Sequence, residues 1–162
     1  MGLLDKRRGP FGDGAASALL EPGERLLTSA LTAAGEPVGV TDRALLLPGA
    51  ERLPWHLVLE AAYAGDTCTL TVTAVAGARH VLALPDPGRV PEAVRERVQS
   101  SILVSRRVAV AGERGVLVAV RRVPDAAPAW QVRPEPGVDL GDPDVRSRVD
   151  AAIAQLRASL GL

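Results

Sequence analysis

Hydrophobic and polar positions between residues 24 and 84 follow the period of two that is typical of half-buried β-strands. The alternation is cleanest over residues 68–75, where Cys68, Leu70 and Val72 share one face and threonines occupy the other. Turn residues separate this run from four others, which cover residues 26–31, 38–47, 52–63 and 79–84. The pattern predicts an antiparallel meander of five strands.

The segment that follows the meander changes to the helical period. In residues 91–103, Val94, Val98 and Ile102 recur at four-residue spacing while charged residues occupy the other positions. Pro91 suits the first turn of a helix, because the amide hydrogen that proline lacks has no partner there. These features predict an amphipathic helix that covers the meander.

The last helix is the one whose ends are best marked. Asp142 offers an N-cap oxygen, Pro143 suits the first turn, and Gly161 ends the pattern. The apolar stripe of this helix consists of Val145, Val149, Ile153, Leu156 and Leu160. Such a stripe predicts packing on the face of a sheet.

The stretch between the two helices is β-like again. Residues 106–111 and 116–122 flank a glycine-rich turn at residues 112–115, and residues 129–133 form a third strand. The predicted fold class is therefore α+β, with a bent antiparallel sheet of about five strands and a helix, followed by three strands and a C-terminal helix.

Composition shifts suggest three segments. Residues 1–23 are rich in glycine and charge and predict a flexible N-terminal arm, residues 24–103 hold the meander and its helix, and residues 104–162 hold the hairpin, the last strand and the last helix. No linker separates the second segment from the third. One merged domain and two small domains therefore both remain open.

Composition and charge disfavour several classes of function. The 162 residues are 47% hydrophobic, enough to fold, and 19 basic residues balance 19 acidic ones, so no global field attracts a polyanion. The aromatic residues are Phe11, Trp55, Tyr63 and Trp130. So few rings cannot form the stacking platform of a single-strand-binding protein, and nucleic acid is not an expected partner.

Cysteine use and hydropathy suggest a location. Cys68 is the only cysteine, no export signal opens the chain, and no apolar run approaches the roughly 20 residues that span a bilayer. We therefore expect a cytoplasmic protein without a transmembrane segment.

Several phrases resemble those of bacterial pleckstrin-homology-like domains. They are Gly-Glu-Arg-Leu-Leu at residues 23–27, Val-Thr-Asp-Arg-Ala-Leu at 40–45 and Leu-Pro-Trp-His at 53–56. Together with residues 94–98 and 139–143, they also resemble a group of uncharacterised actinobacterial proteins, which implies no particular function. The first resemblance covers about half of the chain and implies a strongly bent antiparallel sheet closed by a helix.

Lipid binding does not follow from this resemblance. Pleckstrin-homology domains that grip phosphoinositides carry clustered basic residues in and around the first strand-to-strand loop. The corresponding loop here, residues 32–37, has no basic residue and carries Glu36. The closing helix also lacks the tryptophan typical of eukaryotic members. The resemblance therefore implies a scaffold rather than an activity.

Residues able to do chemistry are few. Cys68 would need a neighbouring base such as His56 or His80 to act as a nucleophile, and its place beside Leu70 and Val72 favours a buried structural thiol. Two histidines and one cysteine fall short of the ligands of a zinc site, and no glycine-rich loop joins a strand to a helix. We therefore expect no catalytic residue, no metal and no cofactor.

The arginines of the predicted hairpin are the most informative charged group. A turn at residues 112–115 would set Arg106 opposite Arg121, with Arg107 and Arg122 beside them, and like charges opposed on a sheet are destabilising. Residues 104–133 carry a net charge of +4 and residues 134–144 a net charge of −4. The two segments either neutralise each other within the fold or leave an arginine surface for an acidic partner or anion.

The sequence thus favours a non-enzymatic cytoplasmic interaction module. It would bind an unidentified protein, or a second copy of itself, through an exposed strand edge or through the surface of Arg106, Arg107, Arg121 and Arg122. One alternative is peripheral attachment to an anionic membrane through Lys6-Arg7-Arg8 and the apolar residues near them. Another is an enzyme whose polar residues converge only in three dimensions.

Overall fold

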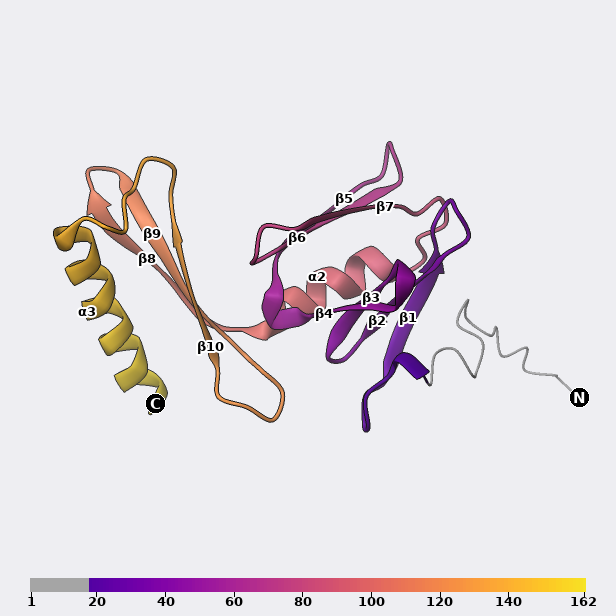
Figure 1. Ribbon diagram of the computed structural model, residues 1–162, viewed down its shortest axis with the longest axis horizontal. Coiled ribbons are helices and arrows are strands. Elements are labelled where there is room, and N and C mark those ends of the chain that lie inside the picture. The colour runs from indigo at the N-terminus through magenta and orange to yellow at the C-terminus, as the bar shows by residue number, and fades with distance from the viewer. Residues whose placement is uncertain (1–17) are drawn as a thin grey trace, which may run out of the picture. The chain divides into compact units, whose positions relative to one another are not determined.

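The computed structural model describes residues 18–162, which form ten antiparallel strands in three sheets and two long helices (Figure 1). The predicted α+β class is confirmed. The chain divides between Ser100 and Ser101 into two compact units, and each unit is described by itself. Most of the predicted N-terminal arm, residues 1–17, lies outside the described residues.

The first unit contains two sheets and a helix. One sheet has the order β1-β2-β3-β4 and the other has the order β5-β6-β7, so each strand pairs with its neighbours in sequence. The strands are β1 Leu26–Leu31, β2 Pro37–Thr41, β3 Ala44–Leu47, β4 Glu51–Pro54, β5 Val58–Ala64, β6 Thr69–Ala74 and β7 Arg79–Ala83, and the helix is α2 Val90–Ser101.

The first unit has more strands than predicted, because two of the predicted strands are each broken. The prediction of one strand over residues 38–47 is wrong: the chain turns after Thr41, whose Oγ1 accepts hydrogen bonds from the amides of Arg43 (3.1 Å) and Ala44 (2.8 Å). The predicted strand over residues 52–63 is interrupted by a 3₁₀ turn, Trp55–Leu57. At the first break, the Thr41 side-chain oxygen bonds to nearby amides and so competes with the hydrogen bonds of the strand ladder.

Aliphatic side chains from both sheets form one core in the first unit. Leu70, Val72 and Ala74 of β6 are buried and alternate with half-buried threonines, as the sequence pattern predicts. The helix α2 adds Val90 and Val94 to the same core. The predicted helix is too long at its C-terminal end, because Ile102 begins the next strand and is exposed.

The second unit is a three-stranded sheet with one helix packed on it. Its strands are β8 Ile102–Ala111, β9 Arg114–Arg121 and β10 Ala129–Pro134, in the order β10-β9-β8, and the helix is α3 Pro143–Leu160. The packing of α3 against β8 and β9 confirms the predicted helix-on-sheet arrangement.

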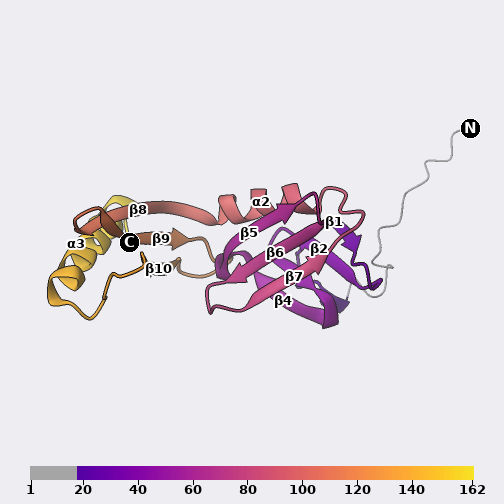
Figure 2. The same ribbon diagram turned by 90° about the horizontal axis from the view of Figure 1, so that it is seen from above.

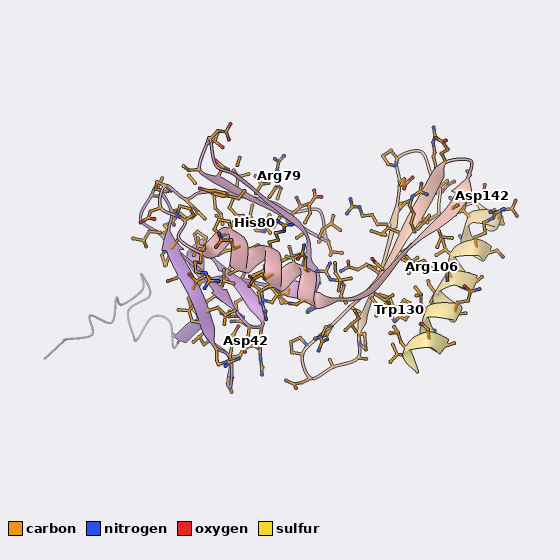
Figure 3. All side chains as sticks on the ribbon, turned by 180° about the vertical axis from the view of Figure 1, so that it is seen from behind. Asp42, Arg79, His80, Arg106, Trp130 and Asp142 are labelled. Atoms are coloured by element: carbon orange, nitrogen blue, oxygen red, sulfur yellow. The ribbon has the colours of Figure 1, made fainter. Side chains whose placement is uncertain are left out.

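The apolar stripe of α3 faces the sheet with one change from the prediction. Val145, Val149 and Leu156 are buried as expected, and Ile153 packs against the core that they form. Leu160 is exposed, because it lies in the last turn of the helix. Trp130 lies on β10 (Figure 3), and the guanidinium carbon of Arg157 of α3 lies over its ring, 5.3 Å from the ring centre.

The predicted hairpin register is wrong. The turn consists of Gly112 and Glu113 alone, since Ala111 pairs with Arg114, and a bulge follows between Ala109 and Ala111. Gly112 takes a positive φ of 59°, which glycine adopts without strain. Gly115 lies inside the ladder rather than in the turn.

The N-cap of α3 is formed as predicted, and its removal is expected to cost about 1 kcal/mol of stability in the second unit. The Asp142 carboxylate accepts a hydrogen bond of 2.9 Å from the Asp144 amide, and Gly161 ends the helix at a φ of 69°. Asp142→Ala should therefore lower the urea midpoint of the second unit, measured by the fluorescence of Trp130 in a Trp55→Phe background. Asp142→Ser, which keeps a capping oxygen, should restore most of the loss. Equal midpoints for the alanine and serine variants would contradict the capping role.

Candidate binding surface

The four arginines singled out in the sequence do not form one surface. Arg106 lies opposite Val118, and Arg107 lies opposite Leu117, so the expected opposition of Arg106 and Arg121 is wrong. The shorter turn and the bulge next to it together shift the register by an odd number of residues, which also exchanges the faces on which the side chains lie.

Each of these arginines has a different environment. Arg121 is only 2% exposed, its Nε donates a 3.0 Å hydrogen bond to Ser101 Oγ, and burial lowers its pKa. Arg122 follows the end of β9, where its amide donates to the Ser101 carbonyl at 2.7 Å. Arg106 and Arg107 are consecutive on β8 and therefore point to opposite faces of the sheet. Both are exposed, and they are the only two of the four arginines that lie on β8.

Arg107 is neutralised within the second unit. Its Nε and Nη2 donate to the two carboxylate oxygens of Glu135 at 2.6 and 2.9 Å, and Nη2 also donates to the Glu113 carbonyl. Glu135 also accepts a 2.8 Å hydrogen bond from the Gly115 amide. The Arg107 guanidinium, together with that amide, holds the pKa of Glu135 below its ordinary value. Here an arginine of the basic segment pairs with a carboxylate of the acidic one.

A glycine is required beside this ion pair. A Cβ at Gly115 would lie 2.9 Å from both the Val108 carbonyl oxygen and the guanidinium carbon of Arg107. Only glycine therefore lets Arg107 cross the strand at this point and reach Glu135.

Arg106 is held only by neutral groups. This arginine lies on β8 (Figure 3), and its Nη1 donates to the Gln155 side-chain oxygen of α3 at 2.8 Å. Arg148 of the same helix donates to the Ala109 carbonyl at 3.5 Å. Among residues 18–162, no carboxylate lies within ion-pairing distance of Arg106 or Arg148. These two guanidinium groups are the cationic part of the candidate binding surface.

The two arginines border a hollow between the strand and the helix. Its volume is about 300 Å³, and its lining comes from residues 106–109 of β8 and from Arg148, Ala151, Ala152 and Gln155 of α3. The two alanines leave room there, because their side chains end at Cβ. Arg148 is not among the residues expected from the sequence, although its spacing of seven from Gln155 places the two on one face of a helix.

The outer edge of β8 presents backbone hydrogen-bonding groups. The Gly115 carbonyl accepts a 3.0 Å hydrogen bond from the Glu135 amide, so the backbone groups of Gly115 point toward β10 and not toward β8. Ala109 is paired with Gly115 across the β8–β9 ladder. Because Gly115 does not bond to β8, Ala109 directs its own amide and carbonyl away from β9. The alternation of a strand gives Arg107 and Ser105 the same direction. Because β8 is the outer strand of its sheet (Figure 2), these groups face the open edge.

The cysteine and the two histidines belong to the first unit, whereas this surface belongs to the second. The expectation that Cys68 lies on the buried face of β6 is wrong: it precedes the strand, has a φ of 51° and is partly exposed. Its thiol donates a hydrogen bond to the Gly65 carbonyl, with 3.6 Å between sulfur and oxygen. His56 lies in the 3₁₀ turn Trp55–Leu57. His80 lies on β7, where its Nε2 is 4.0 Å from Glu51 Oε1. The described residues contain no group of three metal-ligating side chains.

A second hollow lies in the first unit, between its second sheet and α2. It has a volume of about 420 Å³ and is lined in part by Tyr63, Glu92 and Arg95. Burial raises the pKa of Tyr63, and the nearby Cys68 thiol adds to the rise. Glu92 and Arg95 are one helical turn apart at the exposed start of α2, where a carboxylate stabilises the helix dipole.

Comparison with known proteins identifies no relative: no protein-family model, no curated protein and no solved structure matches this chain. Within residues 18–162, neither long helix has the length and apolarity needed to cross a membrane. The basic cluster Lys6-Arg7-Arg8, which suggested membrane attachment, lies outside the described residues. The surface formed by β8 and α3 is therefore the strongest functional feature of the described chain.

Proposed function

We propose that this protein is a non-catalytic interaction module that binds an extended segment of another protein as an added strand beside β8. The observation that carries the proposal is the outward direction of the backbone groups of Ser105, Arg107 and Ala109 on an outer strand. A partner strand would bond to these groups and extend the sheet to four strands.

The composition of β8 supports strand addition. The strand is ten residues long and contains no proline or lysine, two residues that commonly protect sheet edges, and its bulge near Ala111 leaves the ladder regular from Val104 to Ala109. Its polar side chain at Ser105 is exposed and small, and so does not obstruct an incoming backbone.

A partner of different sequence fits this edge better than a second copy does. If β8 paired with itself about its middle, Arg106 and Arg107 of one copy would face the same residues of the other, which is destabilising. The homodimer, the alternative expected from the sequence, is therefore less favourable than a complex with a different protein. Light scattering distinguishes the two.

The first unit is the scaffold of this module. We propose that the first unit is pleckstrin-homology-like, which is supported by its neighbour-to-neighbour antiparallel strands and by the packing of α2 into their core. The proposed setting is the cytoplasm, in keeping with a single cysteine. The proposed lack of catalysis is supported by the separate positions of Cys68 and the two histidines.

The test uses a proline that blocks the edge without touching the β8–β9 ladder. The Ser105 amide points outward, so Ser105→Pro removes one donor from the free edge, where proline is tolerated. Ser105→Ala is the matched control, because it removes the hydroxyl and keeps the amide. Peptides of about ten residues, long enough for a full strand, are selected from a random displayed library against the wild-type protein.

Affinities of the selected peptides are then measured by calorimetry. Ser105→Pro should weaken binding at least about tenfold, because a peptide carbonyl loses its donor, while Ser105→Ala should stay within about twofold. Circular dichroism and light scattering check that all three proteins are folded and equally monomeric. Unchanged affinity for a folded Ser105→Pro variant, or a selection that yields no peptide distinguishing the two variants, would overturn the proposal. Dimerisation that only Ser105→Pro abolishes would replace it with self-association.

A further inference from the structure

We infer that the strand accepted by β8 is acidic, and that it places a carboxylate directly opposite Arg106 on the face of the sheet that α3 covers. Arg148 is the second contact of that carboxylate or of the next one on the same face. This inference rests on the proposed function and adds to it the chemical class of the partner.

Register explains why Arg106 is the residue opposite the carboxylate. An incoming antiparallel strand exchanges its hydrogen bonds with Ser105 and Arg107, which leaves Arg106 in the non-hydrogen-bonded position between them. Residues opposed in that position have Cα atoms only about 4.5 Å apart, and their side chains approach most closely. The Arg106 side chain lies on the α3 side of the sheet, where it reaches Gln155.

The charges on that face are uncompensated within the described chain. Arg106 and Arg148 bond to an amide oxygen and to a backbone carbonyl, and no carboxylate of residues 18–162 lies within ion-pairing distance of either. Two guanidinium groups beside one hollow of about 300 Å³ attract a carboxylate and repel a basic strand.

The hydrogen bond of Arg148 can be exchanged when the strand binds. Arg148 Nη1 lies 3.5 Å from the Ala109 carbonyl, which is long for a hydrogen bond, and that carbonyl is one of the groups that face the open edge. An amide of the incoming strand replaces Arg148 at this carbonyl. The guanidinium is then released for an incoming carboxylate, so the exchange leaves no donor or acceptor without a partner.

The opposite face of β8 does not select for acidic residues. Arg107 points there and already binds both oxygens of Glu135, so a second carboxylate would have to displace the first. The preference therefore applies to alternate residues of the partner, namely those on the face toward α3.

The test uses peptides selected against the wild-type protein and analogues in which each Asp or Glu is replaced by its amide. We expect the selected peptides to carry Asp or Glu at alternate positions. Arg106→Gln and Arg148→Gln should each lower the affinity for the acidic peptides about threefold to tenfold. The affinity for the amide analogues should change by no more than about twofold. Arg146→Gln is the matched control, since Arg146 is on the same helix but does not line the hollow.

The outcomes separate this inference from the function on which it rests. If Ser105→Pro prevents binding while neutral peptides are selected, or while the arginine variants bind normally, strand addition stands and the acidic partner is wrong. If the arginine variants lose binding but Ser105→Pro does not, the surface is an anion site and both proposals fail. Calorimetry with inorganic phosphate identifies that case, because phosphate would then bind in competition with the acidic peptides.

Discussion

Replacing Trp55 by alanine is expected to destabilise the first unit by about 3–5 kcal/mol, the range for removing a large buried aromatic side chain. Trp55 is 4% exposed, and it is packed in the core that joins both sheets of that unit. Its indole Nε1 donates a 3.0 Å hydrogen bond to the Thr41 carbonyl. The substitution would therefore leave both a cavity and a buried carbonyl without its indole donor.

Trp55→Phe separates these two contributions. Phenylalanine fills most of the volume but has no indole nitrogen, so its expected cost is about 1–3 kcal/mol, the penalty for a buried acceptor that loses its donor. Hydrogen exchange followed by mass spectrometry is the measurement, because it reports on each unit separately. Protection of β2 and β6 should fall in the order wild type, phenylalanine, alanine, while the strands β8 and β9 of the second unit serve as the internal control. Equal protection of β6 in wild type and Trp55→Ala would contradict the structural role of this residue.

Elements whose pattern is local could be predicted from the sequence. The strand β6 was predicted from its alternating threonines, and α3 from its cap at Asp142 and its apolar stripe, because each signal lies within the element. The break after Thr41 was missed for a related reason. A threonine within an apolar run is also typical of a continuous strand, and its hydrogen bonds to Arg43 and Ala44 appear only in the folded chain.

The hairpin shows where local reasoning fails. Two glycines, Gly112 and Gly115, both suited the turn, and the sequence did not indicate that the second one is required for the approach of Arg107 to Glu135. That contact joins residues 28 positions apart. The resulting register error misplaced the arginines on the two faces of the sheet and so produced a surface that the structure does not contain.

The candidate site depends on contacts that are distant in sequence. Arg106 and Gln155 are 49 positions apart, and Arg148 and Ala109 are 39 positions apart. Neither pair has a motif to mark it. Only the general expectation of an exposed strand edge and a basic hairpin could be drawn from the chain, and the outward direction of Ser105 required the register of β8 on β9.

Glu24 was also beyond local prediction, and its replacement by glutamine is expected to cost about 3 kcal/mol in the first unit, the lower end of the range for breaking a buried ion pair. Its side chain is fully buried, and its carboxylate binds Arg52 through both oxygens at 2.9 and 3.0 Å. The Glu21 amide donates to it at 2.7 Å, and Thr41 donates through its hydroxyl. Glutamine keeps the shape of this side chain but removes the charge that all of these donors stabilise.

The stability of the first unit should depend on pH through the same carboxylate. Burial alone would raise the pKa of Glu24, but the hydrogen bonds from Arg52, Thr41 and the Glu21 amide outweigh it and hold the pKa below its ordinary value of 4.5. The folded state thus binds this proton less tightly than the unfolded chain does. The stabilisation from the Glu24 carboxylate is fully present above about pH 4.5, the pKa in the unfolded chain. As the pH falls, the unfolded chain takes up the proton first, and the stabilisation is lost as the pH passes through the lower pKa of the folded state.

The difference in unfolding free energy between wild type and Glu24→Gln isolates this dependence. Urea denaturation, followed by Trp55 fluorescence in a Trp130→Phe background, should give a gap of about 3 kcal/mol at pH 7. The gap should narrow as the pH falls below about 4.5, because the protonated glutamic acid then resembles glutamine. Asp42→Asn is the matched control: it removes a carboxylate that meets Arg25 at 3.7 Å near the surface, and it should cost no more than about 1 kcal/mol at either pH. A gap between wild type and Glu24→Gln that stays constant with pH would show that the carboxylate of Glu24 is not the group on which this unit's acid stability depends.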